Sequence, residues 1–532
     1  MHGFGHLHGQ LARRHEHERR RARPLLAERR QPLEQRQRER RGLAGAGRRL
    51  SDQVAAGEQR RDRRALDRRR LLVAERHERL DDPGVEPQRD EFIPRPVFGF
   101  HHRSPTFTGD GTPSGASPAS LCYAAAVSFS ETLRALAANR GVALPPASDP
   151  EPLAALDYGI ERALKDEALA RFWREQGLPG SPEPVVPAPS PRGYRTTSKR
   201  RAALGPKGLA LSFPGTPPIR RGVAPSALDL PEHAAVYALL VERLSRPAAR
   251  ALAAALNWAI VRGPAGGLAV ILNVRVFDAK VVRAGKQLAL HLQEAGLGVR
   301  AGFLYLDPSG SEFYLEARRP VGTLSFKRLF GPEWLQVEAD GVRLRFPPTV
   351  FSQVNGAMLG TMTAAARALL APLGGCALLD LYCGYGLFTL TAGREAAEAV
   401  GVDLDGPAVA AARANALHLR SADRVRFLAG RVDAAFLAGR LRPTRAPEVV
   451  FLDPPRQGTQ PGVAAALAAR RPLRVVHVCC GSDEIPREVA AWARAGYALR
   501  KAVPLDLFAG TANLETLLLL DPGAAPVPGF PS

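Results

Sequence analysis

From about residue 350 the sequence alternates short apolar strands with helices, and this alternation constrains the fold more than any other feature. The runs at 377–382 and 449–452 are apolar almost throughout, as expected for strands of a parallel sheet that is buried on both faces. Further strands are predicted at 399–405, 425–428, 475–479 and 516–520, with helices between them. The pattern predicts a doubly wound, Rossmann-like α/β domain over residues 346–522.

The first 118 residues differ from the rest of the chain in composition. Residues 1–100 contain 25 Arg, no Lys and 16 acidic residues, so they carry +9 of the net charge of +21. A segment with so few apolar residues cannot bury enough surface to offset the conformational entropy that folding removes. We expect residues 1–118 to form a disordered, Arg-rich arm and linker, which either contacts RNA or is dispensable.

The next segment, residues 119–177, has the periodicity of helices. The pattern is clearest at 129–139 and 153–176, but it assigns no function to the segment. A Pro-rich stretch at 178–191 follows and predicts a linker.

Residues 193–345 mix strands and helices less regularly than the C-terminal part. Strands are predicted at 268–277 and 299–306, and a helix at 286–295. This predicts a smaller α+β domain, which we expect to contact RNA, and residues 523–532 complete the chain as a tail.

Composition also limits the class of protein. No run approaches the roughly 20 apolar residues of a transmembrane helix, and Arg and His stand where a secretory signal would need its apolar core. The five cysteines are irregularly spaced and two are adjacent, which supports neither a disulfide framework nor a zinc site. We expect a cytoplasmic monomer without membrane association, and the net charge of +21 favours a polyanionic partner such as RNA.

A glycine-rich turn follows the strand at 377–382, at the edge of the sheet where ligands bind. Gly384 and Gly386 allow a tight turn, and Asp403 ends the next strand about 20 residues later, where a carboxylate can accept hydrogen bonds from ribose hydroxyls. Thr389 occupies the place of the third glycine of pyrophosphate-binding turns. The turn therefore fits a non-phosphorylated nucleoside such as S-adenosylmethionine, whose sulfonium or amino group Asp380 would face.

Four further patterns lie at predicted strand ends or at the start of this domain. They are Phe-Ser-Gln-Val-Asn at 351–355, Phe-Leu-Asp-Pro-Pro-Arg-Gln-Gly at 451–458, Cys-Cys at 479–480 and Asp-Leu-Phe…Leu-Glu-Thr at 506–516. With Asp-Leu-Tyr-Cys-Gly-Tyr-Gly at 380–386, they resemble the RNA 5-methyluridine (uracil-C5) methyltransferase family of class I S-adenosylmethionine-dependent enzymes. Members of this family methylate C5 of uridine in tRNA or ribosomal RNA, and the resemblance runs from about residue 193 to 521 in family order.

The resemblance implies one nucleophile and one base. Cys480 matches the nucleophile, whose sulfur adds to C6 of uracil so that C5 can take up a methyl group, and Glu515 matches the base that then removes the C5 proton. Because the nucleophile must be a thiolate, we expect a lowered pKa for Cys480. A helix that starts near residue 482, with Ser482 as its N-cap, would supply the positive end of its dipole.

The resemblance also implies binding residues. Gln353, Tyr382, Asp403 and Asp453 match cofactor-binding positions, which makes S-adenosylmethionine the expected cofactor. Asp453 could also accept a hydrogen bond from uracil N3–H, and Arg456 is expected to meet a phosphate or the target base.

The chain departs from the family pattern at several positions. Gly481-Ser482 replaces an Asn-Pro, Asn513 replaces a His, and Ala509 replaces a Pro. Some members hold an iron–sulfur cluster on four N-terminal cysteines, but Cys122 is the only cysteine before residue 376, so we expect no cluster and no metal. Two alternatives stay open, namely an RNA cytosine-C5 methyltransferase and a non-catalytic RNA-binding protein that retains the fold. The sequence does not specify the target RNA or uridine.

Overall fold

The computed structural model describes residues 127–310, 326–404 and 406–523, all within one of the two units into which the chain divides, residues 117–532. The arm predicted at 1–118 and the tail beyond Gly523 lie outside the described residues, as does Cys122. In the described part of the chain, no helix combines the length and hydrophobicity of a transmembrane span.

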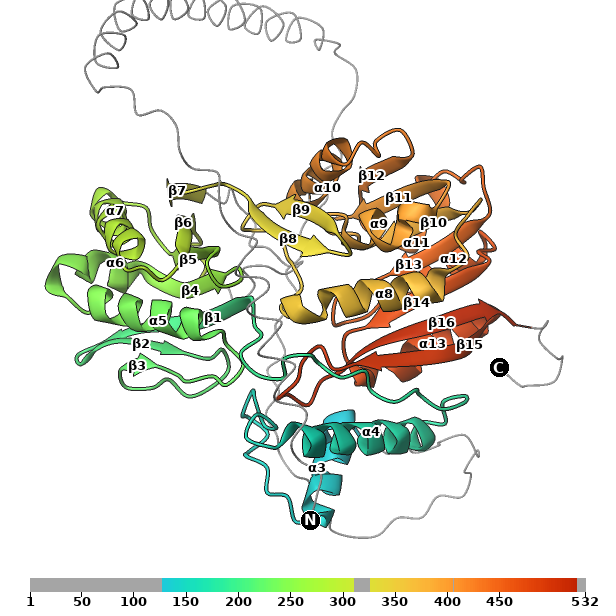
Figure 1. Cartoon of the computed structure of the whole chain (residues 1–532), viewed down its shortest axis with the longest axis horizontal. Helices are drawn as coiled ribbons and strands as arrows, with labels where there is room; N and C mark the ends of the chain where they lie inside the picture. Colours follow the sequence, from blue (N-terminus) through green and yellow to red (C-terminus); the bar gives the residue numbers. More distant parts are fainter. Residues whose placement is uncertain (1–126, 311–325, 405, 524–532) are drawn as a thin grey trace, which may run out of the picture. The chain divides into compact units, whose positions relative to one another are not determined.

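The C-terminal part is built on a seven-stranded sheet with the order β12-β11-β10-β13-β14-β16-β15 (Figure 1). The five strands from β12 to β14 are parallel, whereas β16 runs antiparallel to both β14 and β15. The sheet confirms the predicted doubly wound α/β fold. The strands are β10 (Ala377–Leu381), β11 (Glu398–Asp403), β12 (Val425–Ala429), β13 (Glu448–Leu452), β14 (Arg474–Cys479), β15 (Tyr497–Leu505) and β16 (Glu515–Pro522).

Helices cover both faces of this sheet. Successive strand residues belong alternately to two hydrophobic clusters, one on each face, and each cluster contains residues of different helices. In β10, Leu378 belongs to one cluster, and Leu379 and Leu381 belong to the other. The first cluster contains residues of α8 (Leu359–Leu370), α9 (Leu387–Leu390) and α10 (Gly406–His418). The second contains residues of α11 (Ala434–Gly439), α12 (Val463–Ala468) and α13 (Ile485–Arg494).

The second cluster also includes the helices of the N-terminal segment, α3 (Phe129–Asn139) and α4 (Tyr158–Glu175). The prediction for α3 is confirmed in full, whereas α4 begins five residues later than the predicted 153 because Asp157 caps it. This segment therefore contributes to the core of the C-terminal α/β domain.

The Pro-rich stretch at 178–191 is not a free linker. Its backbone runs beside β15, where Glu183 N–H donates to Ala502 O and Val186 N–H donates to Pro504 O, both at 2.9 Å. Asp506 N–H in turn donates to Val186 O at 3.0 Å. Prolines are tolerated in such a position. At the edge of a sheet the backbone N–H groups on the outer side face solvent and have no strand to bond, so a proline there costs no hydrogen bond.

The central domain contains a second seven-stranded sheet with the order β3-β2-β1-β4-β5-β6-β7. Its strands are β1 (Thr197–Gly205), β2 (Gly208–Ser212), β3 (Gly222–Val223), β4 (Leu256–Arg262), β5 (Leu268–Val274), β6 (Val299–Leu306) and β7 (Phe326–Phe330), and its helices are α5 (Pro231–Leu244), α6 (Arg250–Ala255) and α7 (Ala279–Glu294). The strand predicted at 299–306 is confirmed as β6, and the helix predicted at 286–295 is the second half of α7. The predicted α+β class is therefore confirmed, and a hairpin of β8 (Leu335–Ala339) and β9 (Val342–Phe346) leads into the C-terminal α/β domain.

Candidate active site

The turn after β10 is held in a conformation that few residues adopt. Tyr382, Gly384 and Gly386 all have positive φ, at 65°, 55° and 87°. A Cβ at Gly386 would lie 3.0 Å from the ring of Phe427, so this position also requires a glycine for space. A positive φ at a residue with a large side chain, such as Tyr382, is costly and typical of functional sites.

Acidic and amide side chains converge on this turn from neighbouring strand ends. Gly384 N–H donates to Asp403 Oδ2 at 2.9 Å, and Gln353 Nε2 donates to Asp453 Oδ2 at 3.4 Å. Burial, and to a smaller extent the negative charge of Asp403, raise the pKa of Asp453 to about 7. The structure thus brings together the residues that the sequence assigned to cofactor binding.

Asp380 lies beneath the same turn and is fully buried. Its Oδ2 accepts a hydrogen bond from the Thr389 hydroxyl, while its Oδ1 has no hydrogen-bond partner among the described residues. Burial raises the pKa of Asp380 to about 7, with the charges of Asp453 and Asp403 adding to the effect. A ligand that carries a positive charge and hydroxyl donors would relieve this cluster of carboxyl groups, so the residues present fit S-adenosylmethionine.

Cys480 and Glu515 come together through the antiparallel pairing of β14 with β16. Val475 pairs with Leu520 and Cys479 with Thr516, and the same register places Cys480 opposite Glu515. Among the described cysteines, Cys480 alone is partly exposed, whereas the Glu515 side chain is buried.

The ligand-free pocket does not favour the Cys480 thiolate. Burial raises the pKa of the Cys480 thiol to about 12, the negative charges of Glu515 and Asp453 add to the rise, and Arg456 opposes it. Burial likewise raises the pKa of Glu515 well above its usual range. The prediction of a lowered thiol pKa is therefore wrong for the protein without ligands.

The predicted helix start after Cys480 also differs from the structure. Residues Ser482–Glu484 form a 3-10 turn that precedes α13, and the turn is preceded by Gly481 without a side-chain cap. Ser482 is thus not an N-cap, and the turn carries Glu484, whose negative charge raises the pKa of the Cys480 thiol and so opposes a thiolate.

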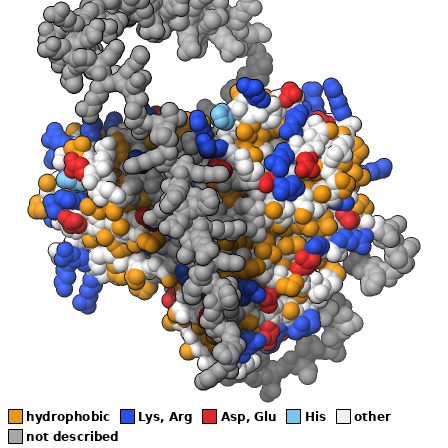
Figure 2. Space-filling view, in the orientation of Figure 1, with side chains coloured by type: hydrophobic (Ala, Val, Ile, Leu, Met, Phe, Trp, Pro, Cys, Tyr) orange, Lys and Arg blue, Asp and Glu red, His pale blue; other side chains and the backbone are white. Residues whose placement is uncertain are grey.

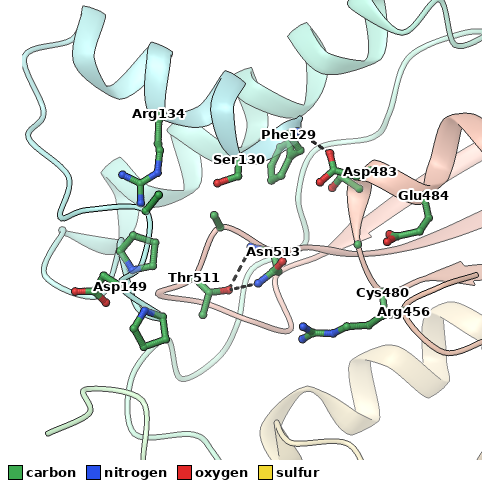
Figure 3. Close-up of a pocket in the computed structure, with 16 residues that line it drawn as sticks. Phe129, Ser130, Arg134, Asp149, Arg456, Cys480, Asp483, Glu484, Thr511 and Asn513 are labelled. Atoms are coloured by element: carbon green, nitrogen blue, oxygen red, sulfur yellow. Dashed lines mark hydrogen bonds between the residues drawn. The ribbon is translucent and has the colours of Figure 1, made fainter. Parts of the chain in front are cut away.

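A pocket of about 320 Å³ opens in front of Cys480 (Figure 3). Its size lies at the lower end of the roughly 300–1,000 Å³ typical of small-molecule sites. One wall carries Arg456, Glu484 and Asn513 around the opening beside Cys480. The pocket therefore combines the predicted nucleophile with Arg456, the predicted substrate residue.

The opposite wall of this pocket was missed by sequence reasoning. It is formed by α3 and by the segment that follows it, with Phe129, Arg134 and Asp149 facing the opening. The Arg134 guanidinium is fixed by the carbonyl oxygens of Pro145, at 2.7 Å, and Pro146, at 3.2 Å. Only a tertiary contact places this wall beside Cys480, so the helical periodicity of the segment gave no signal of its role.

The raised thiol pKa predicts slow alkylation of Cys480. At pH 8 a thiol of pKa about 12 is ionised roughly a thousandfold less than one with the ordinary value of 9.0. We expect iodoacetamide to modify Cys480 about a thousandfold more slowly than an unfolded peptide of the same sequence, with a rate that rises about tenfold per pH unit between about pH 7 and 9. Mass spectrometry of the peptide that contains Cys480 measures this rate. Arg456→Ala should slow the reaction further, and alkylation as fast as in the peptide would contradict the assignment.

Metal ligation has no support in the described residues. Within 127–310, 326–404 and 406–523 there is no group of three or more His, Cys, Asp or Glu side chains able to hold a metal ion. The expected absence of an iron–sulfur cluster stays a prediction.

The strand order and the acidic, glycine-lined turn define an α/β domain of the methyltransferase type. The tRNA (uracil-54, C5)-methyltransferase of Pyrococcus abyssi, solved with S-adenosyl-L-homocysteine, has the same fold, with a TM-score of 0.51 and 18% identity over 71% of this chain and 86% of that chain. The family model for tRNA (uracil-5-)-methyltransferases matches residues 312–522. Residues 312–522 are therefore similar to the RNA (uracil-C5) methyltransferase family.

Curated relatives show the same similarity. An uncharacterized RNA methyltransferase of Thermosynechococcus vestitus is 35% identical over 36% of this chain and 42% of its own length. The 23S rRNA (uracil(1939)-C(5))-methyltransferase RlmD of Aeromonas salmonicida is 35% identical over 46% of this chain and 55% of its own length. The chain thus spans about half the length of the curated relatives that it matches.

Proposed function

We propose that this chain is an S-adenosylmethionine-dependent RNA methyltransferase that forms 5-methyluridine in tRNA or ribosomal RNA. The observation that carries the proposal is the register of β14 and β16, which sets Cys480, just after the end of β14, opposite Glu515 at the start of β16. The relatives named as 23S rRNA (uracil-C5) methyltransferases support the choice of uracil in RNA. A cytoplasmic location and a monomeric state accompany the proposal as predictions.

The cofactor would be held by the carboxyl groups and the turn around Gly384. Asp403 and Asp453 would accept hydrogen bonds from ribose hydroxyls or from the amino group, with Gln353 and Tyr382 beside them. When bound, S-adenosylmethionine supplies the methyl group as an electrophilic carbon on a positively charged sulfur.

Cys480 would make C5 of the target uridine reactive. Its sulfur forms a bond to C6, the thiol proton leaves to a base or to water, and the electron pair of the C5–C6 double bond moves toward C5 and O4. C5 then carries the negative character that uracil itself lacks. Arg456 opposes the rise in the pKa of the Cys480 thiol, so its guanidinium favours the thiolate that this step requires.

Glu515 would complete the cycle as a base. Its carboxylate removes the proton from C5 after methylation, the electron pair re-forms the C5–C6 double bond, and the C6–S bond breaks to release the Cys480 thiolate. Because burial raises the pKa of Glu515, its ionised form is a stronger base than an exposed carboxylate. This matches the role that the family resemblance implies.

RNA as the substrate accords with the distribution of charge. Figure 2 shows Lys and Arg side chains over both the central and the catalytic domain on the face that it presents. Such side chains bind phosphates without regard to sequence, and the pocket beside Cys480 would then receive a base that has been flipped out of its stack.

The proposal is tested with RNA that contains 5-fluorouridine. Fluorine at C5 cannot be removed as a proton, so the adduct with Cys480 is expected to persist as a complex that survives denaturation, and Cys480→Ala should form none. Digestion of ordinary RNA after the reaction should yield 5-methyluridine. Formation of 5-methylcytidine would favour the cytosine-C5 alternative, and the absence of both product and adduct would favour the non-catalytic binder.

A further inference from the structure

Glu484 lies in the pocket of Cys480 without an assigned role. It lines the pocket together with Cys480 and Gly481. Its Oε2 is buried and has no hydrogen-bond partner among the described residues. A buried carboxyl oxygen without a partner is costly, so a donor is expected to reach this carboxyl group when the pocket is filled.

Gly481 makes room for this carboxyl group. A Cβ on Gly481 would lie 2.5 Å from Glu484 Oε2, closer than any real Cβ contact. The backbone does not require a glycine there, because its φ of −150° is open to every residue. The departure from the family's Asn-Pro pattern thus coincides with the position of a carboxyl group beside the nucleophile.

The turn that carries Glu484 is fixed by the opposite wall of the pocket. Phe129 N–H, at the start of α3, donates to Asp483 Oδ1 at 2.7 Å. Figure 3 shows this bond above the opening, with Glu484 and Asn513 below it. Because α3 belongs to the hydrophobic cluster on that face of the C-terminal sheet, the turn that carries Glu484 is held in place before a substrate arrives.

We propose that Glu484 is a substrate-binding residue whose carboxyl group accepts a hydrogen bond from N3–H of the target uracil. The inference rests on the proposed function. The sequence also offered Asp453 as the acceptor from uracil N3–H, and the inference assigns this hydrogen bond to Glu484 instead. Asp453 instead accepts from Gln353 and lies among the acidic residues of the cofactor turn. A carboxylate that accepts from a base N–H forms a charge-assisted hydrogen bond, which rejects a base without that donor.

The test compares two short single-stranded RNAs, one with a central uridine and one with N3-methyluridine, which lacks the donor. Binding to the full chain without cofactor is measured by fluorescence anisotropy. We expect the wild-type chain to prefer uridine by about tenfold or more. Glu484→Ala should reduce this ratio to about one, and Glu484→Gln, which retains an acceptor, should restore part of it. Equal binding of both RNAs by the wild type, or an unchanged ratio in Glu484→Ala, overturns the proposal.

Gly481→Ala provides an independent arm of the test. It leaves the carboxyl group in the protein but displaces it, so it should lower the uridine preference as Glu484→Ala does. The double variant should show no further loss, because both changes remove the same contact. Glu294→Ala is the control, since that side chain is 76% exposed on α7. These measurements need no methylation, so a wild type that discriminates but forms no 5-methyluridine would refute the proposed function alone.

Discussion

Glu515→Gln is expected to leave methylated RNA attached to the protein through Cys480. The amide has nearly the size of the carboxyl group but cannot accept the C5 proton, so the C6–S bond would persist. Loss of a general base slows turnover by roughly 10²- to 10⁴-fold. Denaturing gels of the protein mixed with ordinary RNA and with S-adenosylmethionine labelled in its methyl group should show a labelled protein–RNA band.

Two controls separate this outcome from a damaged pocket. The double variant Cys480→Ala with Glu515→Gln should lose the band, because the sulfur that forms the bond is absent. Glu183→Gln should behave as the wild type, since Glu183 is 45% exposed in an ion pair with Lys501. Wild-type turnover by Glu515→Gln would show that another group removes the proton.

Six of the seven strands of the C-terminal sheet could be predicted because both faces of the sheet are covered. β10 and β13 are buried at every position, so each reads as a continuous apolar run, and its ends fall where polar or turn residues begin. These six predicted strands differ from the observed ones by only one or two residues at their ends, whereas β15 (Tyr497–Leu505) was not predicted. The edge of the sheet was less visible, since the segment at 178–191 looks like a linker and yet runs beside β15.

That the proposed site residues lie together could be predicted, but their electrostatics could not. Asp453 and Cys480 follow the carboxyl ends of the parallel strands β13 and β14, and Glu515 begins β16, which runs antiparallel to β14, so all three lie at the same end of the sheet. The thiol pKa depends instead on burial and on three acidic groups from different strands and turns. Sequence order does not reveal how many charges share one cavity.

The second wall of the pocket lies beyond the reach of local patterns. Phe129 and Asp483 are 354 positions apart, and their hydrogen bond joins an unassigned helix to the turn after the nucleophile. The periodicity of α3 predicts a helix but not its partner. A segment outside residues 312–522, the part of the chain that matches the family model, therefore completes the pocket.

A buried ionic cluster ties the N-terminal segment to the loop before Glu515. Lys165 Nζ lies 2.8 Å from Glu161 Oε1 and 2.6 Å from Asp506 Oδ1, and all three side chains are fully buried. Glu161 also accepts from Gly510 N–H at 2.6 Å and from Arg192 at 2.8 Å. The cluster thus links α4 to residues 506–510, which lead to Glu515, the proposed base.

Lys165→Met is expected to destabilise the folded chain by about 3–5 kcal/mol, because removal of the cation leaves Asp506 buried without its ion-pair partner, beside Glu161, which keeps only Arg192. Denaturant unfolding followed by circular dichroism measures the change. Lys501→Met makes the same substitution in the exposed ion pair with Glu183, where both side chains are more than 40% exposed, and it should cost about 0–1 kcal/mol. Equal effects of the two substitutions would show that the cluster around Lys165 is hydrated. A loss of activity in Lys165→Met at temperatures where the chain remains folded would indicate that the cluster also positions the loop that carries Glu515.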